Sequence, residues 1–313
     1  MLDDHQAAAD RYLPVDELRR WCEPDLTIHT DVARTEDDLV ARLRDAEVVV
    51  AMRERSPLPA RILERLDATR LIVTSGAHNA AIDHRAAAAR GIVVCGTRGK
   101  DAAPAELTWA LLLALVRRLP AEDAGIRAGR WGVHVGDVLE GQRLGILGYG
   151  DIGSRVARYG LAFGMEVLAH SRSLTREAAA ARGVHAVDRE TLLREADVVS
   201  IHLKLTAETA GTIGRRELGL MQRSAVLINT ARGGLVDEPA LVDALRDGTI
   251  AGAGLDVFAQ EPLPADSPLR GLDNVVMTPH IGYVTDDRYR SYFGQAVENI
   301  VAYLRGTPIR ALA

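Results

Sequence analysis

Three residues in the second half of the sequence, Arg232, Glu261 and His280, have the side-chain types needed to reduce a carbonyl beside a carboxylate. Each ends an apolar run typical of a buried parallel strand: AVLINTAR, GLDVFAQE and VVMTPH. Open α/β sheets bind ligands at the carboxyl ends of their strands, which share one edge. We therefore expect the guanidinium, the carboxylate and the imidazole to meet in one crevice.

Each of the three groups has a defined use in such a reaction. A planar guanidinium holds a carboxylate through two hydrogen bonds and polarises the neighbouring carbonyl. An imidazole donates a proton near neutral pH, and an adjacent carboxylate favours its protonated form. Taken singly, a surface ion pair, a turn before proline and a satisfied polar group would explain the same residues. Their shared position at strand ends favours a catalytic set.

The segment GYGDIG, from Gly148 to Gly153, follows the strand-like run RLGIL and precedes a helical pattern. This context predicts a dinucleotide site. Gly148 would permit the tight turn, Gly150 the approach of a pyrophosphate, and Gly153 close packing of helix and strand. Further cofactor contacts are expected at the start of the helix and at later strand ends, at Asp151, Ile152, His202, Thr230, Ala231 and Gly282.

The second strand of this unit ends in the sequence His170-Ser171-Arg172-Ser173. NAD sites usually place a carboxylate here to hold the ribose 2′-hydroxyl, and this segment contains none. Ser171 and Arg172 suit a 2′-phosphate instead, so NADP(H) is favoured. In the alternative, Arg172 is a surface cation and NAD(H) binds without the usual clamp.

Strand-like and helix-like segments alternate along the chain, which predicts an α/β protein with two Rossmann-like or flavodoxin-like domains, parallel sheets and a cleft between them. A long amphipathic pattern near 286–305 has no strand left to feed, so we expect it to return to the first domain. The predicted domains are 1–102 with 284–313 for substrate and 103–283 for the dinucleotide. The expected strands are 48–52, 71–75 and 91–95 in the first domain, and 143–148, 166–170, 197–202, 225–230, 252–257 and 275–279 in the second.

The composition limits the classes of partner. The chain has 313 residues, 47% of them hydrophobic, and a net charge of -5, which argues against nucleic acid. It has two cysteines, Cys22 and Cys95, and no Cys/His spacing typical of a metal site. No signal peptide is recognisable, and the longest apolar run is shorter than the roughly 20 residues of a membrane span. We therefore expect a cytoplasmic protein without membrane contact. An apolar helix near 104–119 suggests a homodimer.

The segments NTARGGLVDEPALVDAL, GLDVFAQEPLP and NVVMTPHIGYVT closely resemble the D-isomer-specific 2-hydroxyacid dehydrogenases, and the likeness covers nearly the whole chain. The resemblance implies that Arg232 binds the substrate and that Glu261 orients His280 as the acid/base. It also implies that Asp256 contacts the nicotinamide carboxamide.

The same resemblance concerns the first domain. It implies that the segment TSGAHNAAID grips the substrate carboxylate through backbone N–H groups, at Ser75, Gly76 and Ala77. Arg53, Lys100 and Tyr283 are further candidate substrate contacts. The family normally begins with an apolar strand, and MLDDHQ does not look like one, so we expect an altered sheet edge.

These observations predict an NAD(P)-dependent D-2-hydroxyacid dehydrogenase that reduces a small 2-oxo acid of the glyoxylate or hydroxypyruvate type. Two alternatives stay open. One is a dehydrogenase of another small anion, such as phosphite or formate, on the same scaffold. The other is a non-catalytic NAD(H)-sensing scaffold similar to a corepressor, which the intact Arg/Glu/His set disfavours.

Overall fold

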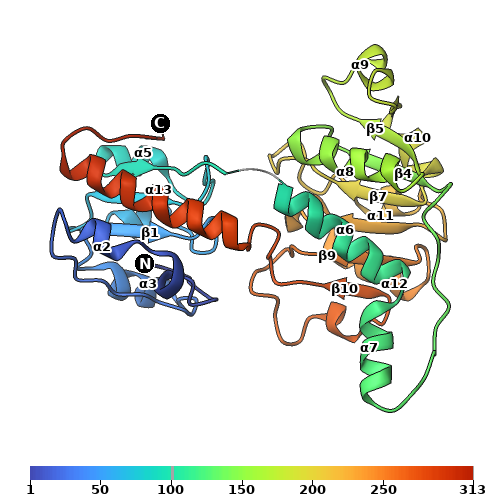
Figure 1. Ribbon diagram of the computed structural model, residues 1–313, viewed down its shortest axis with the longest axis horizontal. Coiled ribbons are helices and arrows are strands. Elements are labelled where there is room, and N and C mark those ends of the chain that lie inside the picture. Colours follow the sequence, from blue (N-terminus) through green and yellow to red (C-terminus); the bar gives the residue numbers. More distant parts are fainter. Residues whose placement is uncertain (100–101, 313) are drawn as a thin grey trace. The chain divides into compact units, whose positions relative to one another are not determined.

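The computed structural model describes residues 1–99 and 102–312 (Figure 1). The chain divides into two compact units, one formed by Met1–Lys100 with Val284–Ala313 and the other by Asp101–Tyr283. Among the described residues, no helix combines the length and apolarity needed to cross a bilayer.

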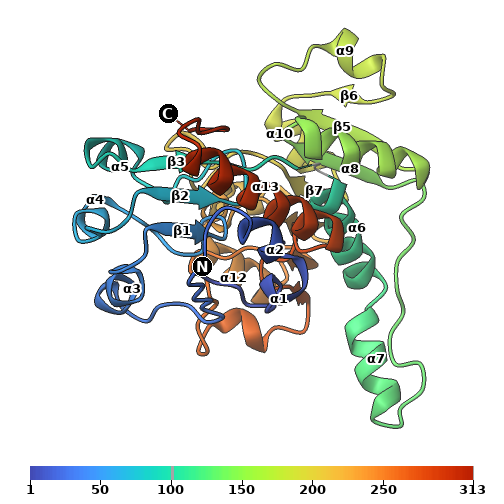
Figure 2. The same cartoon turned by 60° about the vertical axis from the view of Figure 1, so that its left-hand side comes forward.

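The first unit is built on a three-stranded parallel sheet in the order β1-β2-β3. Its strands are β1 (Val48–Ala51), β2 (Leu71–Thr74) and β3 (Val93–Cys95). Helices cover both faces (Figure 2). One face carries α3 (Glu36–Leu43), α4 (Ala60–Leu63) and α5 (His84–Ala89), and the other carries α1 (Ala9–Tyr12), α2 (Val15–Leu18) and α13 (Asp286–Leu304).

Both faces of this sheet are buried because alternate strand residues point in opposite directions. Val49, Ile72 and Val94 belong to the apolar cluster on the α3–α5 side. Leu71, Val73 and Cys95 belong to the cluster that contains α13. The last helix, α13, thus packs against the first sheet.

Residues 1–4 cover the outer edge of β1 without forming a strand. The amide of Leu2 donates to the carbonyl of Val50 at 2.9 Å, and the amide of Asp4 donates to the carbonyl of His29 at 2.9 Å. Leu2 is buried in the α3–α5 cluster. The Asp4 carboxylate then accepts the amides of Ala8 and Ala9 at the start of α1. One apolar residue and one capping carboxylate thus replace a full edge strand.

The second unit is built on a seven-stranded parallel sheet in the order β10-β9-β8-β7-β4-β5-β6. The order reverses between β4 and β7, and a ligand crevice is expected beyond the carboxyl ends of strands at such a point. The strands are β4 (Arg143–Leu147), β5 (Glu166–His170), β6 (His185–Ala186), β7 (Val198–Ile201), β8 (Val226–Asn229), β9 (Gly252–Leu255) and β10 (Val275–Met277).

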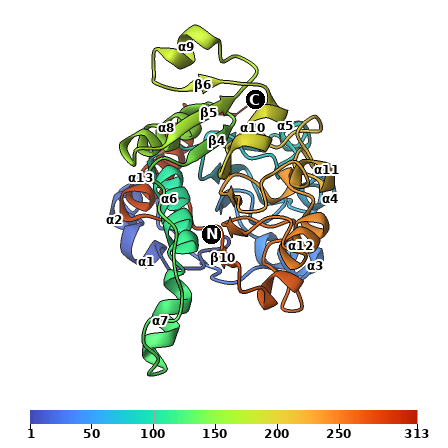
Figure 3. The ribbon, with the colours of Figure 1, turned by 90° about the vertical axis from the view of Figure 1, so that its right-hand side faces the viewer.

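Helices also cover both faces of this sheet (Figure 3). One layer contains α6 (Ala102–Val116), α8 (Asp151–Ala162) and α9 (Arg176–Ala180), and the other contains α10 (Arg189–Glu195), α11 (Arg215–Leu218) and α12 (Glu238–Arg246). Two short 3₁₀ turns, Gly233–Leu235 and Pro268–Gly271, lie in the loops. Helix α7 (Leu119–Arg127) projects from the sheet layers.

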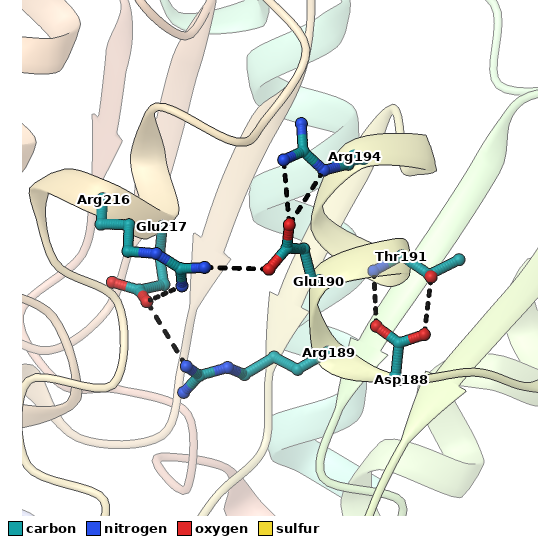
Figure 4. Close-up of polar contacts among 7 residues, drawn as sticks. All are labelled: Asp188, Arg189, Glu190, Thr191, Arg194, Arg216 and Glu217. Carbon is teal, nitrogen blue, oxygen red and sulfur yellow. Dashed lines mark hydrogen bonds and ion pairs between the residues drawn. The ribbon is translucent and has the colours of Figure 1, made fainter.

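An ion-pair network joins α10 to α11 (Figure 4). The Glu190 carboxylate accepts bonds from Arg194 and Arg216, each at 2.9 Å, and these cations lower its pKa. Glu217 accepts from Arg189 and Arg216. Water screens exposed ion pairs, so the network fixes the orientation of α11 more than it adds stability.

The α/β architecture with parallel sheets is confirmed, and each of the nine predicted strands contains an observed one. The short β6, the helices α1 and α2, and α7 were not predicted. The expected helix near 104–119 ends at Val116, because Arg118 adopts a left-handed conformation with φ of 53° and a new helix begins after it.

Candidate active site

The three candidate catalytic side chains follow three neighbouring parallel strands. Arg232 comes after β8, Glu261 after β9 and His280 after β10. The strands are in register, since Asn229 pairs with Leu255 and Leu255 pairs with Met277. All three turns therefore begin at the same edge of one sheet.

His280 and Glu261 form a short polar contact. The imidazole Nδ1 lies 2.6 Å from Glu261 Oε2, and the other carboxylate oxygen accepts the Phe258 amide at 3.0 Å. The His280 side chain is 19% exposed and the Glu261 side chain 33%. A histidine bonded through Nδ1 has its second ring nitrogen, Nε2, for proton exchange with a ligand. The predicted pairing of these two residues is therefore present in the geometry.

The turn after β8 packs against the turn that carries Glu261. A methyl group on Gly233 would lie 1.9 Å from the carbonyl oxygen of Phe258, so only glycine fits there. The Glu238 carboxylate, at the start of α12, accepts the amide of Ala259 at 2.9 Å. Backbone contact and one carboxylate thus hold the position of the Glu261 turn relative to Arg232.

Asn229 shapes the backbone that presents Arg232. Its buried side chain accepts the Ala231 amide at 3.1 Å and donates to the Arg232 carbonyl at 3.0 Å. This is an Asx turn, in which the side chain bonds to the backbone two residues on. The guanidinium of Arg232 donates to the Ala231 carbonyl at 2.7 Å.

Asp256 organises the loop on both sides of His280. One of its oxygens accepts the Thr278 hydroxyl at 2.6 Å and the Ile281 amide at 2.8 Å, and the other accepts the Gly282 amide at 2.8 Å. Its burial raises the pKa, and the three donors oppose that rise. The predicted contact of Asp256 with the nicotinamide stays a prediction.

His280 itself lies in the left-handed region, with φ of 53°. Such a conformation is uncommon for residues other than glycine and costs energy unless neighbours hold it. The bonds from Asp256 to Ile281 and Gly282 supply that constraint. Tyr283, a predicted substrate contact, is 4% exposed, and its ring centroid lies 5.7 Å from that of His280 at an edge-on angle of 78°.

The glycine turn after β4 fits a bound dinucleotide. A methyl group on Gly153 would lie 2.1 Å from the Gly148 carbonyl oxygen, and one on Gly148 would lie 2.6 Å from that of His202. Beside Gly150, by contrast, a methyl group would meet no heavy atom within 4 Å, so this glycine borders open space. Gly150, the N-cap residue of α8, has no side chain to accept bonds from the first amides of the helix. The amides of Asp151 and Ile152, at the positive end of the helix, therefore suit a pyrophosphate.

Three further predicted cofactor residues lie at the same sheet edge. His202 is half-buried, and its removal from water lowers its pKa to about 3, so the imidazole is neutral at physiological pH. Its Nε2 lies 2.8 Å from the Ser200 hydroxyl. The Thr230 hydroxyl bonds to that of Thr108 on α6 at 2.7 Å. A methyl group on Gly282 would lie 3.1 Å from Asp256 Oδ2.

The predicted 2′-phosphate residues occupy the end of β5. Ser171 is half-buried, whereas the Arg172 side chain is 94% exposed. The guanidinium lies 3.8 Å from Glu208, whose side chain is 82% exposed. The sequence reasoning did not include this carboxylate, which follows β7 and reaches the same sheet edge.

The predicted substrate residues of the other unit lie close together. The Ser75 hydroxyl accepts the Arg53 amide at 3.0 Å, and the Arg53 guanidinium packs against Gly76. The Gly76 amide donates to the Thr97 hydroxyl at 2.8 Å, and the Ser75 amide donates to Ala51. Of these three predicted amides, that of Ala77 contacts no acceptor among the described residues, so it is the one left to donate to an anion. Lys100 lies outside the described residues.

The sequence reasoning missed Asn229, Glu238 and Thr108. The Asn229 signal was available, because asparagine at a strand end commonly forms an Asx turn. Glu238 and Thr108 act across distant segments, and nothing local in the sequence marks them. The described residues contain no cluster of three or more histidine, cysteine or acidic side chains suited to a metal ion.

Comparisons with known proteins cover the same turns. The family model of the D-isomer specific 2-hydroxyacid dehydrogenase, NAD binding domain, matches residues 109–282. The chain is 47% identical over 235 residues to a glyoxylate reductase of Aeropyrum pernix, which covers 72% of this chain and 70% of that protein. It is 38% identical over 288 residues to a glycerate dehydrogenase of Methylorubrum extorquens, with 88% of each chain covered. The crystal structure of a phosphoglycerate oxidoreductase from Vibrio cholerae O395 is similar with a TM-score of 0.91 and 34% identity, over 97% of this chain and 98% of that one.

Proposed function

Because the chain belongs to the D-isomer-specific 2-hydroxyacid dehydrogenase family and is an NAD(P)-dependent 2-hydroxyacid dehydrogenase, we propose that it reduces a small 2-oxo acid such as glyoxylate or hydroxypyruvate, with His280 as the acid/base. The observation that carries the proposal is the 2.6 Å contact between His280 and Glu261 at the edge shared by three strands. We assign the dinucleotide to residues 103–283 and the substrate-binding role to 1–102 with 284–313.

Each side chain then has one task. The bound nicotinamide supplies the hydride. His280 gives a proton from Nε2 to the oxygen of the reduced carbonyl, and Glu261 keeps the ring oriented through its contact with Nδ1. Arg232 holds the substrate carboxylate and polarises the carbonyl. Arg53, Ser75, Gly76, Ala77 and Tyr283 stay predicted substrate contacts.

Replacing the acid/base tests this assignment. In His280→Ala, kcat for glyoxylate reduction should fall by roughly 10²–10⁴, the usual contribution of a positioned general acid. The dissociation constant of NADPH, measured by fluorescence titration, should change little. His185→Ala, which removes an exposed imidazole from β6 of the same unit, is the matched control. Turnover of His280→Ala close to that of the control would overturn the assignment.

We propose NADP(H) as the preferred cofactor, because Ser171 and Arg172 stand where NAD sites carry a carboxylate. The neighbouring Glu208 opposes this preference, since its charge would repel a 2′-phosphate. Arg172→Gln should raise KM for NADPH by about tenfold and leave KM for NADH nearly unchanged. Glu208→Gln should lower KM for NADPH. Equal effects of Arg172→Gln on both nucleotides would refute the phosphate clamp.

The two alternatives make different kinetic predictions. A dehydrogenase of another small anion would turn over phosphite or formate faster than any 2-oxo acid in a panel followed by nucleotide absorbance. A nucleotide-sensing scaffold would bind NADH without turnover. The relatives named glyoxylate reductase and glycerate dehydrogenase favour the 2-oxo acid assignment over both.

We also propose a homodimer, because α7 and the segment after it present apolar side chains to solvent. Ile126 is 55% exposed, Trp131 86%, Val135 96% and Val138 70%. These side chains are exposed in a single copy, and exposed apolar surface of this kind is typical of subunit contacts. Sedimentation should give the mass of two chains. Trp131→Ser with Val135→Ser should lower the measured mass toward that of one chain. An unchanged mass in that variant would show that α7 and the segment after it do not form the subunit contact.

A further inference from the structure

A surface cavity of about 320 Å³ lies in the second unit, on the outer side of α8. It is lined by Tyr149, Ser154, Arg158 and Leu161, and by Arg182, which follows α9. Ser154, Arg158 and Leu161 are spaced three and four residues apart, so they share one face of the helix. The opposite face of α8, with Gly153, Val156, Ala157 and Gly160, is buried against the sheet.

The charge of this cavity is uncompensated within the described residues. No acidic side chain lines it, and neither Arg158 nor Arg182 forms an ion pair there. Both guanidiniums lie near tyrosine rings instead. Arg182 is 5.8 Å from the centre of the Tyr149 ring, and Arg158 is 5.4 Å from that of Tyr159. The arginines of the α10–α11 network contrast with these two, because carboxylates accept their bonds (Figure 4).

The residues predict the chemistry of an occupant. Two guanidinium forks match the roughly two negative charges that a phosphate monoester carries at pH 7, and they bind its oxygens in pairs. The Tyr149 ring and Leu161 supply an apolar wall that a bare phosphate would not use. The volume is at the lower end of small-molecule sites, which start near 300 Å³. A compact phosphate ester with a flat or apolar group fits all three features.

We propose that this cavity binds a small organic phosphate, at a site separate from those of the cofactor and the 2-oxo acid. The assigned phosphate-binding amides are at the start of α8, beside the open space next to Gly150. The cavity takes Tyr149 from that turn but otherwise uses residues further along α8 and Arg182. A ligand there would contact the residue between Gly148 and Gly150 without occupying the pyrophosphate position.

Phenyl phosphate is a suitable probe, because it joins a dianion to a flat ring and carries no 2-oxo acid. We expect the full chain, held at saturating NADH and low ionic strength, to bind it with a Kd below about 1 mM by isothermal titration. Inorganic phosphate and benzoate, which each lack one half of the probe, should bind about tenfold more weakly. Low salt is needed because exposed charges are screened within about 10 Å at 0.1 M.

Variants decide whether the cavity is responsible. Arg158→Gln with Arg182→Gln should weaken phenyl phosphate binding by at least about tenfold and leave glyoxylate turnover unchanged. Arg176→Gln, which removes an exposed cation from α9 outside the cavity, should bind the probe as the wild type does. Each single variant gives a smaller loss and guards against misfolding of the pair.

Three results would overturn the proposal. The first is an absence of saturable binding. The second is displacement of the probe by NADH or NADPH, which would make the cavity part of the cofactor site. The third is equal affinity of the double variant and the Arg176→Gln control.

Discussion

Replacing Glu261 by glutamine tests how the carboxylate assists His280. The side chain keeps its size, and the amide oxygen can still accept the Phe258 amide. The negative charge 2.6 Å from Nδ1 is lost, however, and the nitrogen of the new amide can only donate to the ring. The ring would then lose both its orientation and its hydrogen bond to a charged group.

The expected size of the effect follows from the contact. A hydrogen bond to a charged group contributes about 1.5–3 kcal/mol. The two side chains are 19% and 33% exposed, so water screens part of the interaction, and the lower half of that range applies. Because about 1.4 kcal/mol corresponds to a factor of ten in rate, kcat/KM should fall roughly 10- to 50-fold. This is less than the loss expected for His280→Ala.

The assay is steady-state reduction of glyoxylate at several pH values, with cofactor affinity measured separately by fluorescence. Glu190→Gln is the matched control, because it removes a carboxylate from the exposed α10–α11 network and touches none of the three strand-end turns (Figure 4). A loss below about threefold, or an equal loss of NADPH affinity, would refute the role assigned to Glu261.

Three further predictions concern the supports of the site. Gly153→Ala should weaken NADPH binding by more than about tenfold, because the added methyl group would lie 2.1 Å from the Gly148 carbonyl oxygen. Gly294→Ala is the control, because a methyl group there meets open space. Equal NADPH affinity of the two variants would contradict the close packing at Gly153. Asp256→Asn should lower the free energy of unfolding by about 1–3 kcal/mol in urea titrations and reduce kcat. The reason is that an amide cannot accept all three bonds from Thr278, Ile281 and Gly282. An unchanged free energy of unfolding would show that these bonds are dispensable. Burial lowers the pKa of His202 from 6.5 to about 3, so the unfolded chain binds this proton more tightly than the folded one, and the free energy of unfolding should decrease as the pH falls from 6.5 toward 3. His202→Gln should make that decrease smaller. An unchanged decrease in the variant would show that another group causes it.

The sequence predicts the sheets well because their strands are apolar on both faces. Runs such as LIVT in β2 and VLIN in β8 are buried at every position, as expected of parallel strands covered by helices. The glycine turn is equally predictable from the sequence, since the tight contacts of Gly148 and Gly153 exclude any side chain at these positions. In both cases a local constraint leaves its mark on the local sequence.

Elements held by distant contacts were harder to predict. The first residues read as polar, yet Leu2 packs against the first sheet, and its amide bonds to Val50. The two-residue β6 is too short to produce an alternating pattern. The sequence also gave no sign that Glu208 would lie near Arg172, because the two residues follow different strands that converge only in the folded sheet. Such pairs depend on strand order, and no local pattern encodes strand order.

The buried carboxylate of Asp256 explains why His280 can stand in a strained backbone. Burying a charge without partners is costly, and here three donors offset that cost. Two of those donors are the amides directly after His280, so the bonds that stabilise the charge also fix the left-handed turn at φ of 53°. The third donor, Thr278, ties the residue two positions before the histidine to the same carboxylate. Asp256 thus fixes the backbone on both sides of His280, while Glu261 fixes the ring, and neither task can be done by the other residue.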